Sequence, residues 1–242
     1  DIREGKTWKT AKLDHDLLSI QYILYTCDTK IDNWDKIFKD KSVDILKLVF
    51  SFSWFEFFDS CYNSGIIDEI NDALSTIMMK GQKIVPYPEL LFAPLNCTNS
   101  NNIKVIILGQ DPYFTSTKTG IPVARGFSFA VPIGCKNSPS LENICKNMIK
   151  FGHRKDSNIN LAELCMQGCL FINSAFTTIE GTAGEHNDIW NNFTSCLLKY
   201  IIGINNKIVF LSWGQASHKL CKEIINTDIH KVITSSHPSP YS

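Results

Sequence analysis

The stretch IKVIILGQDPY, residues 103–113, decides the fold. It consists of a short, mainly β-branched run, Ile103 to Leu108, which is apolar except for Lys104 and ends abruptly in Gly109-Gln110-Asp111. A run that is apolar on both faces is typical of a central strand in a parallel sheet covered by helices. We therefore expect a buried strand that places Asp111 at its carboxyl end.

Three further segments share this design. They are Cys169 to Ile172 before Asn173-Ser174, Ile208 to Leu211 before Trp213-Gly214-Gln215, and Val232-Ile233 before Ser235-Ser236-His237. The intervening stretches have helical periodicity, around Leu141 to Ile149, Leu161 to Met166, Trp190 to Ile202 and Ala216 to Ile225. This repeated β-α unit predicts an α/β fold with a central, mostly parallel four-stranded sheet flanked by helices. Ligand sites in such folds gather at the carboxyl ends of the strands. The residues expected to converge there are Asp111, Asn173, Gln215 and His237.

The beginning of the chain has a different character. Apolar residues recur at helical spacing, first at Leu17, Leu18, Ile20, Ile23 and Leu24 and later at Ile45, Leu46, Val49 and Phe50, without a cluster of polar groups. We predict a helical N-terminal extension over residues 1–53 and a functional domain over residues 54–242. Because the chain begins at Asp1 without Met and stops at Ser242 inside an expected loop, we also expect a fragment with an incomplete C-terminus.

Composition limits the classes of partner. Lys plus Arg and Asp plus Glu number 24 each, so a polyanion would have to be held by a local patch, by backbone amides or by helix N-termini. No apolar run is long enough to span a bilayer, which predicts a soluble protein without a membrane partner. We expect a monomer.

Nine cysteines are scattered without a C-x-x-C pair, which is typical of free thiols in a reducing, intracellular compartment. Cys165 and Cys169 are one helical turn apart and have no His or Cys partners nearby in the sequence. They fit the core better than a metal site, so no metal is expected.

The candidate site residues each have a structural interpretation as well. Asp111-Pro112 is an ordinary turn in most proteins, and a solitary His such as His237 is usually structural. However, Pro238 and Pro240 stiffen the loop that presents His237, as a reacting group requires. Asn173 fits a turn, or it could read a base edge with its amide donor and acceptor. Phe129 fits the core equally well.

Six motifs in order resemble those of the family-1 uracil-DNA glycosylases, over roughly Trp54 to Ser242. They are Ile106 to Tyr113 (water activation), Gly126 to Val131 (uracil stacking), Pro139 to Ile144 (the end of a proline-rich loop), Leu170 to Ala175 (uracil recognition), Phe210 to Gln215 (a Gly-Ser loop) and His237 to Ser242 (a minor-groove loop). The resemblance implies a DNA repair enzyme that flips uracil out of DNA and hydrolyses its N-glycosidic bond without a cofactor. Its partner would be uracil-containing DNA, single- or double-stranded, in a compartment with access to DNA.

The resemblance also implies a role for each matching residue. Asp111 would orient the water or stabilise the positive sugar, and His237 would donate a hydrogen bond to a uracil carbonyl oxygen. Gln110 would contribute backbone contacts to the base, Phe129 would stack on it and Asn173 would read its edge. Tyr113 would exclude the methyl group of thymine. The residues expected to contact DNA are Ser140, Gly214, Gln215, Ser239 and, as a wedge, Tyr241.

Two other hypotheses remain. The chain could be a DNA-binding or replication-assembly module that has kept the fold with weakened catalysis, or a glycosylase for another base. Against the first, the key residues Asp111, Tyr113, Asn173 and His237 occur together; Tyr113 and Asn173 also argue against the second. The abundance of Asn, Ile and Lys is typical of an AT-rich genome such as that of a large DNA virus.

The sequence departs from the family's pattern at several positions. Phe114 replaces a His after Tyr113, which should lower catalytic efficiency. About five additional residues separate Tyr113 from Phe129, and Lys118 and Arg125 in that loop could contact DNA. Gln215 replaces a Ser and Tyr241 replaces a Leu, and an aromatic wedge could stack on neighbouring bases. His186 lies one position out of register with a family His, and we interpret it as a structural cap.

Overall fold

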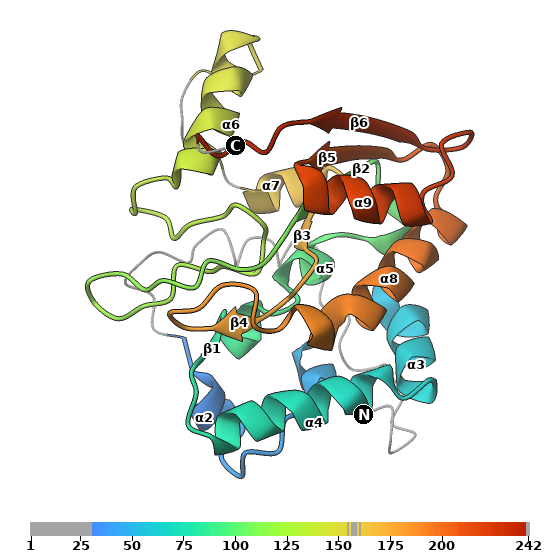
Figure 1. The fold of residues 1–242 in the computed structure, drawn as a ribbon. Helices are drawn as coiled ribbons and strands as arrows, with labels where there is room; N and C mark the ends of the chain where they lie inside the picture. Colours follow the sequence, from blue (N-terminus) through green and yellow to red (C-terminus); the bar gives the residue numbers. More distant parts are fainter. Residues whose placement is uncertain (1–30, 154, 156–158, 160, 241–242) are drawn as a thin grey trace.

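The computed structural model of the protein describes residues 31–153, 155, 159 and 161–240. Its centre is a four-stranded sheet in which all neighbours are parallel, in the order β3-β2-β5-β6 (Figure 1). The strands are β2 (Val105–Gly109), β3 (Cys169–Asn173), β5 (Val209–Trp213) and β6 (Lys231–Ser235). The predicted α/β fold with four parallel strands flanked by helices is confirmed, and each strand ends one or two residues beyond its apolar run.

Helices surround this sheet. The α-helices are α2 (Trp34–Ile37), α3 (Phe55–Asn63), α4 (Ile66–Met79), α5 (Ala93–Cys97), α6 (Pro139–Lys150), α7 (Leu161–Met166), α8 (Asn187–Ile204) and α9 (Gln215–Ile224). Single 3-10 turns are η3 (Ile45–Leu48), η4 (Phe52–Trp54), η5 (Pro88–Leu90) and η6 (Ser100–Asn102). A small antiparallel ladder joins β1 (Ile84–Val85) to β4 (Thr178–Ile179).

The central strands are buried on both faces because successive side chains alternate between two hydrophobic clusters. Ile106 and Leu108 of β2 belong to a large cluster with α3, α4 and α8, whereas Ile107 between them belongs to a smaller one with α5 and α7. β6 is different: it lies at the edge and four of its five residues are exposed. The alternation explains why a continuous apolar run, rather than a period of two, identifies the interior strands.

The described part of the N-terminal segment differs from a helical extension. Trp34, Ile45 and Val49 are buried in the large cluster, so residues 34–49 complete the main core. The spacing at 45–50 predicts a helix, but only the turn η3 forms. The Asn96 side chain accepts hydrogen bonds from the backbone N–H groups of residues 50 and 51, which replaces helical bonding. The positions at 17–24 lie outside the described residues, and a domain boundary at residue 53 stays a prediction.

The strand register brings the polar residues together. Gly109 pairs with Asn173, and Trp213 pairs with Ser235, so the chain leaves neighbouring strands at the same edge of the sheet. The loops after β2 and β3 are then tied together, because the Ser174 and Ala175 N–H groups donate to the carbonyls of Gly109 and Gln110 at 2.9 and 3.0 Å. This edge carries the candidate site.

Candidate active site

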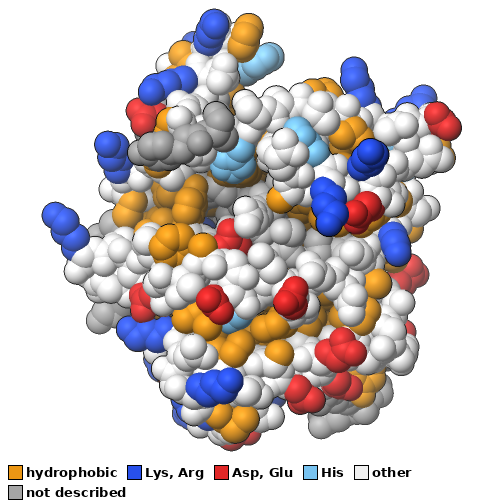
Figure 2. Space-filling model, viewed as in Figure 1, with side chains coloured by type: hydrophobic (Ala, Val, Ile, Leu, Met, Phe, Trp, Pro, Cys, Tyr) orange, Lys and Arg blue, Asp and Glu red, His pale blue; other side chains and the backbone are white. Residues whose placement is uncertain are grey.

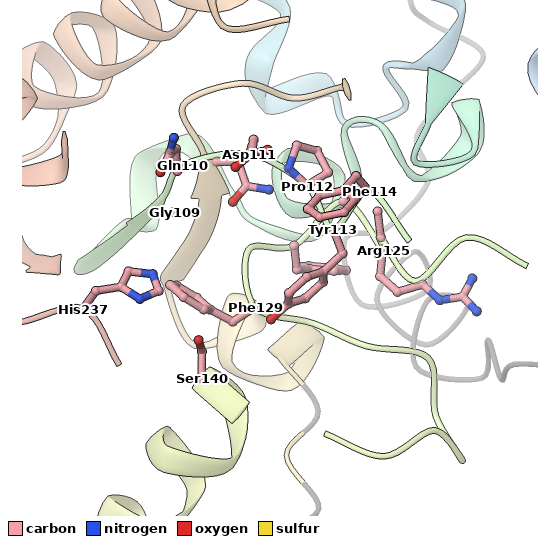
Figure 3. A pocket seen from close by; sticks show the side chains of 14 residues that line it. Gly109, Gln110, Asp111, Pro112, Tyr113, Phe114, Arg125, Phe129, Ser140 and His237 are labelled. Atoms are coloured by element: carbon pink, nitrogen blue, oxygen red, sulfur yellow. The ribbon is translucent and has the colours of Figure 1, made fainter. Parts of the chain in front are cut away.

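A cavity of about 200 Å³ opens at the carboxyl edge of the sheet (Figure 3). Its walls come from the loop after β2, the segment 124–129, the first turn of α6, the end of β3 and the loop after β6. The lining residues that the sequence predicts for the site are Gln110, Asp111, Tyr113, Phe129, Ser140, Asn173 and His237. The fold therefore brings seven of the predicted residues into one cavity.

The carboxylate of Asp111 is fixed by a backbone donor. The N–H of Gly184, in the loop between β4 and α8, donates to Asp111 Oδ2 at 2.8 Å. Burial raises the pKa of Asp111 above its ordinary value, and this hydrogen bond lowers it again in part. Sequence reasoning missed Gly184, and the turn-forming run Gly181-Thr182-Ala183-Gly184 is the only signal that could have indicated it.

Asn173 ends β3 with its side chain packed against the backbone of β2. It is 5% exposed, and a Cβ added to Gly109 would lie 2.3 Å from Asn173 Oδ1. Only glycine at position 109 allows this close approach. The amide is thus held in the cavity by the strand pairing and by the absence of a neighbouring side chain.

Phe129 lies at the centre of the cavity, between Tyr113 and His237 (Figure 3). Its ring centroid is 5.6 Å from that of Trp213 and 5.8 Å from that of His237. Its backbone has φ of 66°, a left-handed conformation that is unfavourable for a bulky residue. Strain of this kind persists where the surroundings impose it and clusters at functional sites.

Tyr113 is held by the start of α6. Its hydroxyl lies 2.5 Å from Ser138 Oγ, and Ser138 Oγ also accepts the Leu141 N–H as the N-cap of α6. Burial raises the pKa of Tyr113, so the phenol stays neutral. Its ring is therefore a fixed part of the cavity wall.

The His237 ring is oriented from its own loop. The Ser239 N–H donates to His237 Nδ1 at 3.1 Å, which leaves the ring proton on Nε2. Burial lowers the pKa of His237, which also favours the neutral imidazole. The loop is attached to α6, since Asn143 Nδ2 donates to the Pro238 carbonyl at 2.9 Å. His237 is thus a neutral ring with a donor at Nε2.

Gln215 and Gly214 occupy an adjoining cavity rather than the first one. This second cavity, of about 310 Å³, lies at the N-terminus of α9 and shares Gly109, Gln110 and His237 with the first. The expected convergence of Gln215 with Asp111 is therefore only approximate. Ser239 lines neither cavity, and Tyr241 lies outside the described residues.

Two departures from the family's pattern, Phe114 and the longer loop, lie in the segment that follows Tyr113. Phe114 is 37% exposed at the cavity, and its carbonyl accepts the Gly181 N–H at 2.7 Å. The longer loop folds back on itself through a bridge between Ser116 and Pro122. Arg125 is 6% exposed and points away from the cavity centre, so in this loop Lys118 is the exposed cation that could meet DNA (Figure 3).

His186 is a buried neutral ring. It is 1% exposed, and Nδ1 lies 2.8 Å from Thr177 Oγ1, which also accepts the Trp190 indole N–H at 2.7 Å. Burial lowers the pKa of His186 to about 4. The residue occupies the N-cap position of α8, but its side chain makes no capping hydrogen bond. Its contact with Thr177 is the interaction that holds it.

Two further properties concern the described residues. Within them, no group of three or more His, Cys, Asp or Glu side chains is arranged to hold a metal ion. In the same part of the chain, no helix combines the length and the apolar character needed to cross a membrane.

Comparisons with known proteins give a consistent result. The family model described as the uracil DNA glycosylase superfamily matches residues 97–242. A probable uracil-DNA glycosylase of Acanthamoeba polyphaga mimivirus is 41% identical over 225 residues, which cover 92% of this chain and 60% of that protein. The uracil-DNA glycosylase of Caenorhabditis elegans is 34% identical over 78% of this chain and 67% of its own length. The chain thus spans about 60% of the mimivirus relative's length.

The similarity to uracil-DNA glycosylases extends to solved structures. The crystal structure of mimivirus uracil-DNA glycosylase matches with a TM-score of 0.88 and 40% identity, covering 93% of this chain and 82% of that one. A mimivirus UNG variant in complex with UGI matches with a TM-score of 0.87 and 41% identity, covering 91% of this chain and 82% of that one. The similarity to viral proteins fits the compositional expectation of a viral source.

Proposed function

Because this chain belongs to the uracil DNA glycosylase superfamily, we propose that it flips uracil out of DNA and hydrolyses the N-glycosidic bond, releasing free uracil and leaving an abasic site. The observation that carries the proposal is the meeting of Asp111, Asn173 and His237 with Phe129 in one cavity. A carboxylate, an amide, a neutral imidazole and an aromatic face are together what excision of a pyrimidine requires.

Recognition of uracil follows from the cavity walls. The Asn173 amide offers one donor and one acceptor side by side, which complements the carbonyl and N–H at the edge of uracil. The Phe129 ring provides a face for stacking, and backbone groups of Gln110 line the same space. Tyr113, held by Ser138, would collide with the methyl group that distinguishes thymine from uracil.

The chemistry follows from where charge develops. As the bond between the sugar C1′ and uracil N1 breaks, its electrons leave with uracil, so the sugar becomes positive and the base negative. The Asp111 carboxylate stabilises the sugar and orients the water that adds to C1′. His237 Nε2–H donates to the uracil oxygen that gains charge. A donor oriented like His237 Nε2–H typically lowers the activation free energy by about 3 kcal/mol. The proton released by the water finally neutralises the uracil anion.

The DNA contacts are proposed for residues at the rim. Ser140 lines the cavity, while Gly214 and Gln215 lie beside it at the N-terminus of α9, where backbone N–H groups favour an anion. Ser239 would face a phosphate and Tyr241 would fill the space that the flipped base leaves. This substrate requires a compartment with access to DNA, and the structure of a relative with UGI leads us to expect that this chain also binds UGI.

The experiment is release of the base from oligonucleotides that carry uracil, thymine or cytosine at one position, in the presence of a chelator. We expect free uracil from the first substrate only. Replacing Phe114 with His should raise the rate if the missing polar group limits efficiency. Tight binding of uracil-containing DNA without any release would instead favour a DNA-binding module with weakened catalysis.

A further inference from the structure

The helix α6 connects the candidate site to a protruding part of the molecule. Ser140 in its first turn lines the cavity, and Asn143 in its second holds the His237 loop. Beyond these residues the helix stands out from the body of the protein (Figure 1). Leu141 and Cys145 are its buried residues, whereas Lys146 and Lys150 are exposed. Its distal half is therefore an accessible surface continuous with the site.

The segment that contains α6 and its flanking residues is basic although the chain is neutral overall. Residues 133–155 contain Lys136, Lys146, Lys150 and Lys155, all exposed, and Glu142 is the one acid in that stretch of sequence. Glu142 lies 3.4 Å from Lys146, but both side chains are largely in water, where such a pair contributes little.

Acidic side chains that balance these lysines are concentrated in another part of the molecule. Residues 51–79, which include α3 and α4, contain five acids and neither Lys nor Arg. Figure 2 shows basic side chains along the top of the view over α6 and acidic ones at the lower right over α3 and α4. A polyanion approaching the cavity would therefore be drawn toward α6 and away from the opposite end.

The spacing of the lysines supports a role in binding. Lys146 and Lys150 are four residues apart, so their like charges lie side by side on the helix and destabilise it slightly. Lys150 Nζ lies 5.5 Å from the ring centroid of Phe151, a side chain that is 66% exposed. A phosphate would remove the repulsion between the two lysines, and the exposed ring could pack against a sugar.

We propose that the distal half of α6 and the segment that follows it, which carry Lys146, Lys150 and Lys155, bind the phosphate backbone of DNA several nucleotides from the flipped base. This inference rests on the proposed function, which places DNA at the cavity. The 12 residues of α6 span about 18 Å. Since DNA rises about 3.4 Å per nucleotide, the helix reaches roughly five nucleotides from the phosphate near Ser140.

The test is the salt dependence of binding to a long, uracil-free duplex by the parent and by a variant with Lys146→Gln, Lys150→Gln and Lys155→Gln. Each lost phosphate contact should reduce the slope of log K against log salt by about 0.9, so the expected reduction is about 2.7. A matched variant with Lys36→Gln, Lys47→Gln and Lys80→Gln changes the net charge equally at exposed positions outside residues 133–155. Its slope should equal that of the parent.

A second measurement locates the contact between the lysines and the DNA. Uracil is moved along a duplex of fixed length, and kcat/KM of the α6 variant is compared with that of the parent at each position. The defect should disappear when the arm on one side of uracil is shorter than about five base pairs. An unchanged salt slope, or a defect independent of arm length, would overturn the proposal. Because binding is measured without uracil, a parent that binds but releases no base would refute the proposed function and leave this inference intact.

Discussion

At the scale of single residues, Gly109 shows how the backbone sets the position of the Asn173 amide. An added Cβ would lie 2.3 Å from Asn173 Oδ1 and 2.9 Å from Ser128 Cβ. Gly109→Ala should therefore displace the amide and lower kcat/KM for uracil release by about 10²-fold, comparable to the loss of one oriented group. Steady-state kinetics measure the effect.

Gly203 provides the matched control for that variant. It lies in α8 with nothing within 4 Å of an added Cβ, so Gly203→Ala should keep full activity and gain about 1 kcal/mol in stability. Equal activity of both variants would show that the Asn173 side chain is not confined by residue 109.

The pKa shifts of Asp111 and His237 predict a particular pH profile of kcat/KM. Burial raises the pKa of Asp111 above 3.8, and the carboxylate is the active form, so kcat/KM should fall as the pH drops through a pKa above that value. Burial lowers the pKa of His237 below 6.5, so the neutral donor dominates at higher pH. We expect kcat/KM to be level from about pH 6.5 to about 8. A decline of about tenfold per pH unit in that range would mean that the imidazolium is the donor.

Only some of the residues in the candidate site could be predicted from the sequence. Asp111, Asn173 and His237 could be predicted because each comes shortly after a short apolar run. Gly184 and Ser138 could not, because one acts through its backbone N–H and the other as a helix cap that also contacts Tyr113. The turn-forming run at Gly184 and the Ser138-Pro139 start of α6 are visible in the sequence, but neither pattern indicates which distant side chain the residue contacts.

At the scale of elements, α6 supports the loop that carries His237. The hydrogen bond from Asn143 Nδ2 to the Pro238 carbonyl joins two segments that are 95 residues apart. Asn143→Ala should lower kcat/KM about two- to tenfold, since such a bond contributes about 0.5 to 1.5 kcal/mol. Asn147→Ala, one turn further along the same exposed helix, is the control and should retain parental kinetics. If both variants behaved alike, the loop would be positioned by other contacts.

The elements also show where periodicity misleads. The strands and α6 to α9 lie close to their predicted positions, because their apolar faces are long enough to specify one structure. At 45–50 the spacing is helical, but Asn71 and Asn96 accept the backbone N–H groups of Ile45 and Phe50. Side chains that are distant in sequence thus determine the local backbone, which no local pattern reveals.

At the scale of the whole molecule, His186 couples stability to pH. Its pKa is near 4 when folded and near 6.5 when unfolded, so the unfolded chain takes up a proton that the folded chain excludes. Stability should therefore fall as the pH drops from about 6.5 toward 4, by up to about 3 kcal/mol. The measurement is the free energy of unfolding in urea at several pH values.

The change in the free energy of unfolding with pH, rather than its absolute value, tests the role of His186. His186→Gln should flatten the slope between pH 6.5 and 4, whereas His153→Gln, at an exposed position after α6, should leave it unchanged. A slope unaffected by His186→Gln would assign the acid sensitivity to other groups.

Asp111 and His237 are proposed to form one active site for uracil excision. The most direct test is the single-turnover rate of uracil release, with enzyme in excess, for the parent, Asp111→Asn and His237→Leu. We expect each variant to be slower by about 10²- to 10³-fold. Asp111→Asn should also unfold at an equal or higher temperature, because its amide oxygen can still accept the Gly184 N–H without a buried charge. Release of uracil by Asp111→Asn at the parental rate would contradict the account.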